Sequence, residues 1–219
     1  MVEEKKIGNN AAVTEVKRKG YDLLKRLFDI VISYNLLLLS YIPMMIIGIA
    51  IRVSCGGPVI FRQIRIGYGG RKFVCYKFRT MSNDAPPSLS TGEFTDAEKY
   101  ITPIGRFLRR TSLDELPQLF NVLSGEMSIV GPRPLIPQEE RMHEIRKAHG
   151  VYSVRPGITG LAQVCGRDML CDERKAECDA VYVMGRGVRS DVNIMMRTVG
   201  NVFAGDGIRR AGHGNKKYN

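Results

Sequence analysis

Two adjacent carboxylates, Asp114 and Glu115, follow two neighbouring arginines, Arg109 and Arg110. A carboxylate can attack phosphorus as a nucleophile, and a second carboxylate can hold Mg²⁺ together with substrate phosphates. Arginines beside them can neutralise phosphate oxygens through charge-assisted hydrogen bonds. The alternative is helix capping with surface ion pairs, which is the fate of most such clusters. The spacing therefore indicates phosphoryl chemistry as one of two interpretations.

The helix that follows this pair can begin in two registers. Ser112 and Glu115 have the spacing of a capping box, but Pro117 would then fall past the first turn, where its missing N–H matters. A start at Asp114 keeps the proline within the first turn, where it is tolerated. In both registers the two carboxylates lie at a helix N-terminus, where free N–H groups and the helix dipole stabilise negative charge.

Two loops rich in glycine and proline each hold an arginine. They are Gly131–Pro134, which contains Arg133, and Arg155–Gly160. Restricted backbones of this kind can present guanidinium and N–H groups to a diphosphate. Simple turn formation is the alternative interpretation.

The overall charge points to an anionic partner. The 219 residues include 33 Lys and Arg against 22 Asp and Glu, which gives a net charge of +11. A nucleic acid, a membrane surface or a phosphorylated substrate would each suit this charge, as would ordinary solubilisation. The sequence has no helix-turn-helix, RNA-binding strand signature or zinc finger, so we expect no nucleic acid. The five cysteines show no CxxC pair, which disfavours a zinc site and fits reduced thiols.

An uncharged apolar segment runs from Ile30 to Ile51 and is long enough to cross a bilayer. Basic residues flank it on both sides, whereas a spanning helix usually has one basic flank, on the cytoplasmic side. Pro43 lies near its middle and should kink the helix. We therefore predict a re-entrant membrane helix over residues 21–53, broken at Pro43, which enters and leaves on the same face. A spanning anchor is the alternative.

The remaining sequence predicts a small α+β domain that is mostly helical. Residues 1–20 are polar and expected to be flexible, with a helix beginning at about Glu15, and residues 206–219 form a basic flexible tail. We expect residues 54–205 to form a domain that holds the candidate catalytic residues. Within it, residues 59–62 and 72–78 favour a hairpin, and residues 82–95 favour a loop. Helical periodicity recurs at residues 104–110, 115–123, 138–149, 173–184 and 190–203. The last of these helices has an apolar stripe that suits either a core or a bilayer surface.

Several ordered motifs together resemble the monotopic phosphoglycosyl transferases, or bacterial sugar transferases, over residues 20–205. The motifs are Lys25–Asp29, Pro58–Phe61, Tyr76–Met81, Thr111–Asn121, Val130–Pro134 and Val154–Gln163. Each motif alone would be weak evidence. The chain has no multi-helix N-terminal extension, so it resembles the minimal catalytic form of the family. It departs from the family's frequent Ser-Pro at the helix break, because Ile42 precedes Pro43.

The resemblance implies an enzyme on the cytoplasmic face of the bacterial inner membrane. It would transfer a phosphosugar from a UDP-sugar to polyprenyl (undecaprenyl) phosphate by a ping-pong mechanism. Asp114 would attack phosphorus, and Glu115, with Asp114, would hold Mg²⁺. The positions implied for substrate-phosphate binding are Lys77, Arg109, Arg133, Arg155, Pro156, Gly157, Thr159 and Asp179.

The positive charge would also suit anionic membrane lipids, and a homo-oligomer remains open. The sugar, the length of the polyprenyl chain and the final glycan are not specified by any motif. The alternative function is a non-enzymatic membrane scaffold for glycan assembly. A scaffold should tolerate loss of the Asp114 carboxylate, whereas an enzyme of this kind should not.

Overall fold

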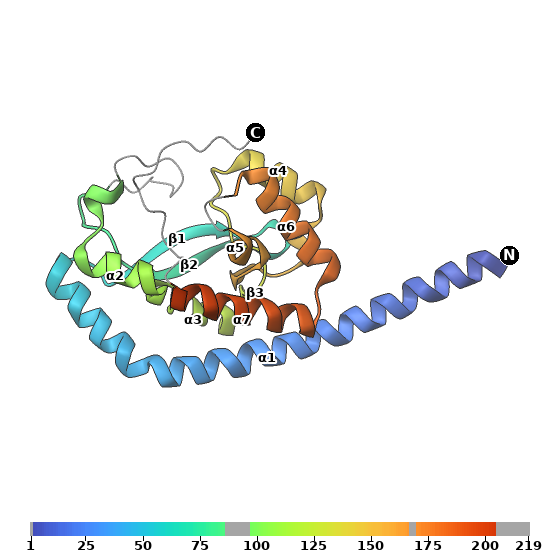
Figure 1. Cartoon of the computed structure of the whole chain (residues 1–219), viewed down its shortest axis with the longest axis horizontal. Helices are drawn as coiled ribbons and strands as arrows, with labels where there is room; N and C mark the ends of the chain where they lie inside the picture. Colours follow the sequence, from blue (N-terminus) through green and yellow to red (C-terminus); the bar gives the residue numbers. More distant parts are fainter. Residues whose placement is uncertain (1, 86–96, 167–169, 205–219) are drawn as a thin grey trace.

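The computed structural model describes residues 2–85, 97–166 and 170–204. A long helix, α1 (Val2–Cys55), passes along a smaller domain that contains most of the other elements (Figure 1). The mostly helical α+β architecture predicted from the sequence is confirmed. The predicted basic tail and most of the predicted 82–95 loop lie outside the described residues.

Helix α1 differs from the prediction at both its start and its middle. It begins at Val2 rather than near Glu15, since the sequence contains no proline before Pro43 to stop it. It also continues through Pro43 instead of breaking there. Its C-terminal half, which contains that proline, bends visibly (Figure 1). The hydroxyl of Ser40 donates to the Leu36 carbonyl at 2.6 Å, a side-chain bond that favours bending of helices.

The part of α1 from Gly20 to Cys55 is long and apolar enough to cross a membrane, and its most apolar 18-residue window has a mean hydropathy of 2.2. Only 11% of its most apolar window is buried inside the protein. Most of its apolar side chains are exposed; Leu39 and Ile42, for example, have 76% and 68% of their surface exposed. A core helix of a soluble domain would bury these side chains, so this exposure suits a lipid environment.

Polar contacts fix α1 to the domain. The carboxylate of Asp29 accepts a hydrogen bond from the backbone N–H of Ile129 at 3.0 Å and is almost fully buried. The guanidinium of Arg26 donates to the carbonyls of Val122 and Leu123 at 2.6 and 2.9 Å. These carbonyls lie at the end of a helix, where cations are favoured. These contacts therefore fix the position and orientation of α1 relative to the domain.

The predicted hairpin is confirmed, with a longer first strand than expected. Strands β1 (Ile60–Ile66) and β2 (Lys72–Phe78) pair antiparallel, joined through a short 3-10 turn at Tyr68–Gly70. Successive side chains of a strand point to opposite faces. Phe78 accordingly packs into an apolar cluster with Ile47 and Ile51 of α1. Its neighbour Lys77 points to the other face of the hairpin and donates to Glu115.

The predicted helices are present, with small shifts at their ends. They are α2 (Pro103–Thr111), α3 (Gln118–Ser124), α4 (Glu140–Ala148), α6 (Asp172–Gly185) and α7 (Val188–Ala204). A short helix, α5 (Leu161–Cys165), and 3-10 turns at Ala97–Tyr100 and Val151–Ser153 were not predicted. They are too short to show a helical period in the sequence.

A second, parallel sheet was also missed. Strand β3 (Ser128–Val130) pairs with β4 (Gly157–Thr159). The backbones approach closely here, because a Cβ built on Gly157 would lie 2.1 Å from the nitrogen of Gly131. Both glycines are therefore required for contact between the two loops that were singled out in the sequence.

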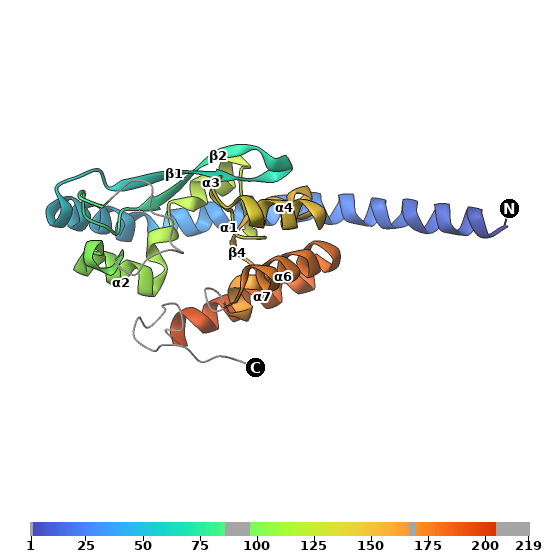
Figure 2. The ribbon, with the colours of Figure 1, turned by 90° about the horizontal axis from the view of Figure 1, so that it is seen from above.

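Helices α6 and α7 form a layer on the opposite side of α1 from the hairpin (Figure 2). The carboxylate of Asp191 on α7 joins this layer to α1, because Tyr21 and Lys25 donate to it at 2.7 and 2.8 Å. The hydroxyl of Tyr182 on α6 donates to the same carboxylate at 3.0 Å. This buried polar junction sets how the C-terminal helices sit against the membrane helix.

Candidate active site

The carboxylate pair lies in a single 3-10 turn, η3 (Leu113–Glu115), between α2 and α3. Ser112 adopts a left-handed conformation with φ 57°, which ends α2, and its side chain makes no capping bond. Pro117 is the N-cap of α3. Both predicted starts are therefore wrong for the α-helix, although Ser112 is the N-cap of the 3-10 turn that contains the pair. The pair precedes the helix instead of occupying its first turn, because the turn at Ser112 and the proline together delay helix formation.

Glu115 is the anchored member of the pair. Its Oε1 atom accepts from Lys77 Nζ at 2.7 Å and from Arg133 Nη1 at 3.3 Å. Burial opposes ionisation of this carboxyl, but the charges and hydrogen bonds of Lys77 and Arg133 prevail and hold its pKa at about 2. Glu115 is therefore a carboxylate at every physiological pH, and two cations are fixed around it.

Asp114 is the member left available for chemistry. Burial raises the pKa of its carboxyl, and the neighbouring charge of Glu115 raises it further, against the opposing effects of Lys77, Arg109 and Arg133. Among the described residues, none donates a hydrogen bond to this carboxylate. The environments of the two carboxyls thus drive their pKa values apart, which assigns them different roles. A more basic and unpaired carboxylate is the better nucleophile.

Arg109 is oriented toward the pair by α2. Its Nε donates to the hydroxyl of Thr80 at 2.8 Å, and burial lowers its pKa while the nearby Asp114 charge raises it. Helix α2 can come this close only because residue 105 is glycine: a Cβ there would lie 2.0 Å from the carbonyl oxygen of Thr80. The helix is capped by Thr102, which accepts from the N–H of Gly105 at 3.0 Å.

Lys77 reaches the pair from β2, and the buried amide of Asn121 sets the distance between β2 and α3. The Nδ2 of Asn121 donates to the Val74 carbonyl at 2.7 Å, and the Oδ1 of Asn121 accepts from the Tyr76 N–H at 3.1 Å. These two bonds match both hydrogen-bonding ends of a side chain that is fully buried. The strand carrying Lys77 is therefore fixed relative to the helix that follows Glu115.

Arg133 is presented by a loop whose carbonyls are held from three directions. Arg146 donates to the carbonyl of Arg133 at 2.7 Å, and Arg65 donates to that of Pro134 at 3.0 Å. The N–H of Gly157 donates to the Pro132 carbonyl at 2.9 Å. Burial and then the charge of Arg133 lower the pKa of Arg65 to about 10, so it remains a cation at neutral pH.

Asp179 lies behind this loop rather than in the site. Its carboxylate accepts from Arg146 at 2.5 Å, and the two side chains are 1% and 4% exposed. A side chain this enclosed cannot contact a substrate. Burial raises the pKa of Asp179, and the Arg146 charge opposes that effect. The residue therefore acts through Arg146 on the backbone of the Arg133 loop.

The loop that contains Arg155 also supports the site indirectly, without contacting the carboxylate pair. Arg155 donates to the Gly125 carbonyl at 2.8 Å and lies over the ring of Tyr68, so these contacts place it away from Glu115. The hydroxyl of Thr159 bonds that of Thr198 on α7 at 2.6 Å. Pro156 and Gly157 contribute backbone pairing with β3 and the following loop. Of the predicted phosphate-binding residues, the structure thus gathers Lys77, Arg109 and Arg133 around the carboxylate pair.

Sequence reasoning missed four supporting residues: Arg65, Thr80, Asn121 and Arg146. Only Arg146 carried a usable signal, since it follows the buried Met142 by one helical turn and so falls on the buried face of α4. A cation on a buried helical face requires a partner. Thr80 and Asn121 lie within motifs that carry the family resemblance, but their roles, like that of Arg65, are recognised only from long-range contacts.

The donor set fits a magnesium ion that is shared with substrate. Within the described parts of the chain, no group of three or more His, Cys, Asp or Glu side chains could form a metal cage. Both contacts to Glu115 use Oε1, so its Oε2 and the Asp114 carboxylate accept no hydrogen bond from the described residues and could bind a hard cation. Mg²⁺ commonly uses one or two carboxylates and takes its other ligands from phosphates and water.

The structure thus combines an exposed apolar helix with a carboxylate pair that is surrounded by cations. The chain belongs to the bacterial sugar transferase family, whose model matches residues 20–205. Family membership and the exposed helix together establish a membrane protein of the sugar transferase class.

Relatives of known name fall into two size groups. The chain is 39% identical over 191 residues to the uncharacterized sugar transferase EpsL of Bacillus subtilis, covering 87% of this chain and 93% of that protein. It is 41% identical over 184 residues to the UDP-glucose:undecaprenyl-phosphate glucose-1-phosphate transferase of Escherichia coli, covering 81% and 39%. It is 37% identical over 217 residues to the undecaprenyl-phosphate galactose phosphotransferase of Salmonella typhimurium, covering 92% and 44%. The chain thus spans less than half of these two longer relatives.

Proposed function

We propose that this protein transfers a sugar phosphate from a UDP-sugar to undecaprenyl phosphate or a similar polyprenyl phosphate. The products are UMP and a polyprenyl-diphosphate-sugar, the lipid-linked starting point of a bacterial glycan. The observation that carries the proposal is the Asp114 carboxylate, which accepts no hydrogen bond from the described residues and lies beside Glu115, Lys77, Arg109 and Arg133. The names of the longer relatives supply the substrate classes.

In the first half-reaction, an oxygen of Asp114 attacks the phosphorus that bears the sugar. The bond from that phosphorus to the bridging oxygen breaks, UMP departs, and the sugar phosphate remains on the aspartate as a mixed anhydride. Arg109 and Arg133 are placed to neutralise charge on the phosphate oxygens. Lys77 holds Glu115 in position, because its ammonium is bonded to that carboxylate at 2.7 Å.

In the second half-reaction, a phosphate oxygen of the polyprenyl phosphate attacks the same phosphorus. The phosphorus–aspartate bond breaks, and Asp114 returns to its carboxylate form. Splitting the transfer into two steps lets a soluble donor leave before a lipid acceptor arrives. Lys77, Arg109 and Arg133 would serve both halves, since the charge on the phosphorus oxygens is the same in each.

Glu115 and Asp114 would hold Mg²⁺ when the donor is bound. The ion would supply Lewis-acid stabilisation of the diphosphate and of the departing UMP. The carboxylates of the chain contribute at most two ligand groups, so binding of the ion should depend on the donor's phosphates.

The placement of the site suits the cytoplasmic face of a bacterial inner membrane. A re-entrant α1, bent in the half that contains Pro43, would leave both its ends on one side, together with the domain that it carries. A soluble UDP-sugar and a lipid phosphate could then meet at the interface. The net charge of +11 would favour binding of the protein to anionic lipids.

We expect the rate of the first half-reaction to rise with pH in the acidic range. Only ionised Asp114 can attack, and its pKa lies above the ordinary value of 3.8, so the protonated fraction is larger at a given acidic pH. Glu115, with a pKa of about 2, stays ionised throughout. Because Lys77 lowers the pKa of Asp114, Lys77→Met should move the midpoint of the acid limb to higher pH. A pH profile of kcat/KM for the donor checks this, and an unmoved midpoint would count against Asp114 as the titrating group.

The reaction itself is tested by UMP release from a panel of UDP-sugars with undecaprenyl phosphate and Mg²⁺. We expect release from at least one donor, lost on chelation of the ion. Without acceptor, intact-mass measurement should show a phosphosugar adduct on the protein. The alternative, a non-enzymatic scaffold for glycan assembly, predicts neither release nor adduct with any donor.

A further inference from the structure

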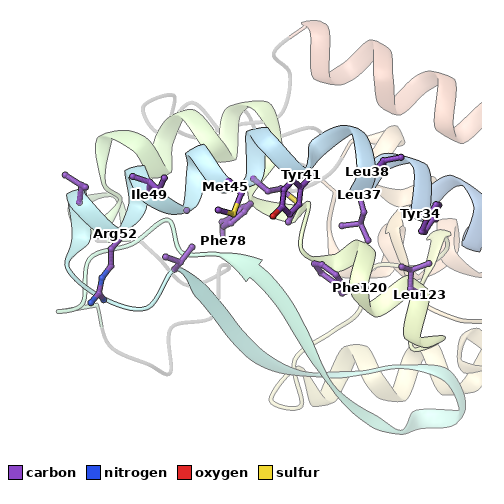
Figure 3. Close-up of a pocket in the computed structure, with 14 residues that line it drawn as sticks. Tyr34, Leu37, Leu38, Tyr41, Met45, Ile49, Arg52, Phe78, Phe120 and Leu123 are labelled. Atoms are coloured by element: carbon purple, nitrogen blue, oxygen red, sulfur yellow. The ribbon is translucent and has the colours of Figure 1, made fainter.

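An apolar groove of about 850 Å³ runs along α1, between this helix, the hairpin and α3. Figure 3 shows Leu37, Tyr41 and Ile49 of α1 on one side, with Phe78, Phe120 and Leu123 opposite. Among the described residues that line it, Arg52 alone is charged, and its guanidinium donates to the carbonyls of Gly56 and Gly57. The groove therefore offers hydrocarbon contact along almost its whole length.

The groove lies within the part of α1 that belongs in a membrane. Its α1 wall extends from Tyr34 to Val53, inside the apolar stretch Gly20–Cys55. At 1.5 Å per residue this wall is roughly 28 Å long. A hollow this long and apolar at membrane depth is accessible to hydrocarbon chains from the bilayer.

The groove is also continuous with the packing that supports the carboxylate pair. Phe78, which lines it, directly follows Lys77 in β2 and shares an apolar cluster with Leu113 and Leu116. These two leucines flank Asp114 and Glu115 in the chain. A hydrocarbon chain in the groove would therefore contact Phe78, whose cluster includes the two leucines that border the carboxylate pair.

We propose that this groove holds the isoprenoid chain of the polyprenyl phosphate acceptor, close to the end that carries the phosphate. The inference rests on the proposed function, and it deepens that function by assigning a site for the lipid chain. At roughly 30 Å³ for a group of the size of a water molecule, the volume accommodates about 28 carbon atoms. That corresponds to between five and six isoprene units, so the rest of a longer chain extends into the bilayer.

Chain-length dependence of the acceptor tests the assignment. Gly48 lines the groove, and a Cβ added there would lie 3.5 Å from Val59, which is an ordinary contact, so Gly48→Phe should fill the groove without disrupting the helix. The matched control is Ile46→Phe, which adds bulk on the same helix at a side chain that is 62% exposed and outside the groove. Initial rates would be measured in nanodiscs with acceptors of two and of eleven isoprene units.

The filled groove should raise the KM for the long acceptor by about tenfold or more, because several isoprene units lose their contacts. The KM for the short acceptor should rise by a smaller factor, because only two isoprene units can lose contacts. Ile46→Phe should change neither value. As a second variant, Phe120→Ala removes one wall at a side chain that is 53% exposed, and should also weaken the long acceptor more than the short one.

Two results would overturn the assignment while leaving the proposed function intact. One is equal sensitivity of both acceptors to Gly48→Phe and Phe120→Ala. The other is an unchanged KM for the long acceptor in both variants, which would mean that ordinary membrane lipids occupy the groove. Failure of wild type to transfer to either acceptor would instead reject the proposed function, and this inference with it.

Discussion

Replacing Asp114 with Asn should abolish turnover, lowering kcat by roughly 10⁴-fold or more. The amide keeps the shape of the side chain but has no anionic oxygen to attack phosphorus. The protein should fold as well as wild type, since burial already disfavours the Asp114 charge and raises its pKa. UMP release measures the loss, and intact-mass measurement without acceptor should show the phosphosugar adduct on wild type alone.

The matched control for this variant is Asp172→Asn, the same chemical change at an exposed carboxylate of α6. Asp172 pairs with Lys175 on the helix surface, at 3.1 Å, and surface pairs of this kind contribute little to stability. Its turnover should equal that of wild type. Adduct formation or full turnover that persists in Asp114→Asn would assign the nucleophile to another residue.

The hairpin shows how far local pattern can predict this fold. Alternating β-prone residues on either side of a glycine-rich turn were sufficient to place both strands. The β3–β4 pair has three residues per strand, separated in sequence by helix α4 and a 3-10 turn, and so leaves no periodicity. Pro43 predicted a break in α1, but the helix continues through the proline and only bends in the half that contains it.

The site was predicted in its residue types but not in its geometry. Lys77 and Arg133 are 38 and 18 residues from Glu115, and only the resemblance to a family suggested that they act together. The resemblance could not distinguish cations that contact the pair from those that support it. Arg155 carries the same charge as Arg133, yet its guanidinium is held by the Gly125 carbonyl. Contacts between distant segments decide such questions, and a single sequence does not encode them locally.

The second large effect is expected from Arg146, a residue that touches no reacting group. Arg146→Met should lower kcat/KM for the donor by about 10²-fold, because the Arg133 carbonyl loses its 2.7 Å hydrogen bond and the loop can shift by a fraction of an ångström. It should also destabilise the protein by about 3–5 kcal/mol, since Asp179 is left as an unpaired buried charge. Activity and thermal unfolding of the same preparation measure the two effects.

A double variant, Arg146→Met with Asp179→Leu, separates positioning from stability. Replacing both partners of a buried ion pair with apolar side chains is often neutral or stabilising, so the unfolding temperature should return close to that of wild type. The donor kcat/KM should remain low, because no group then holds the Arg133 carbonyl. Recovery of activity together with stability would show that the pair supports only the fold. Continued loss of activity in a stable protein would show that the contact of Arg133 with Glu115 depends on Arg146, which lies behind the loop. Asp179, which holds Arg146, would then affect a site that it does not contact.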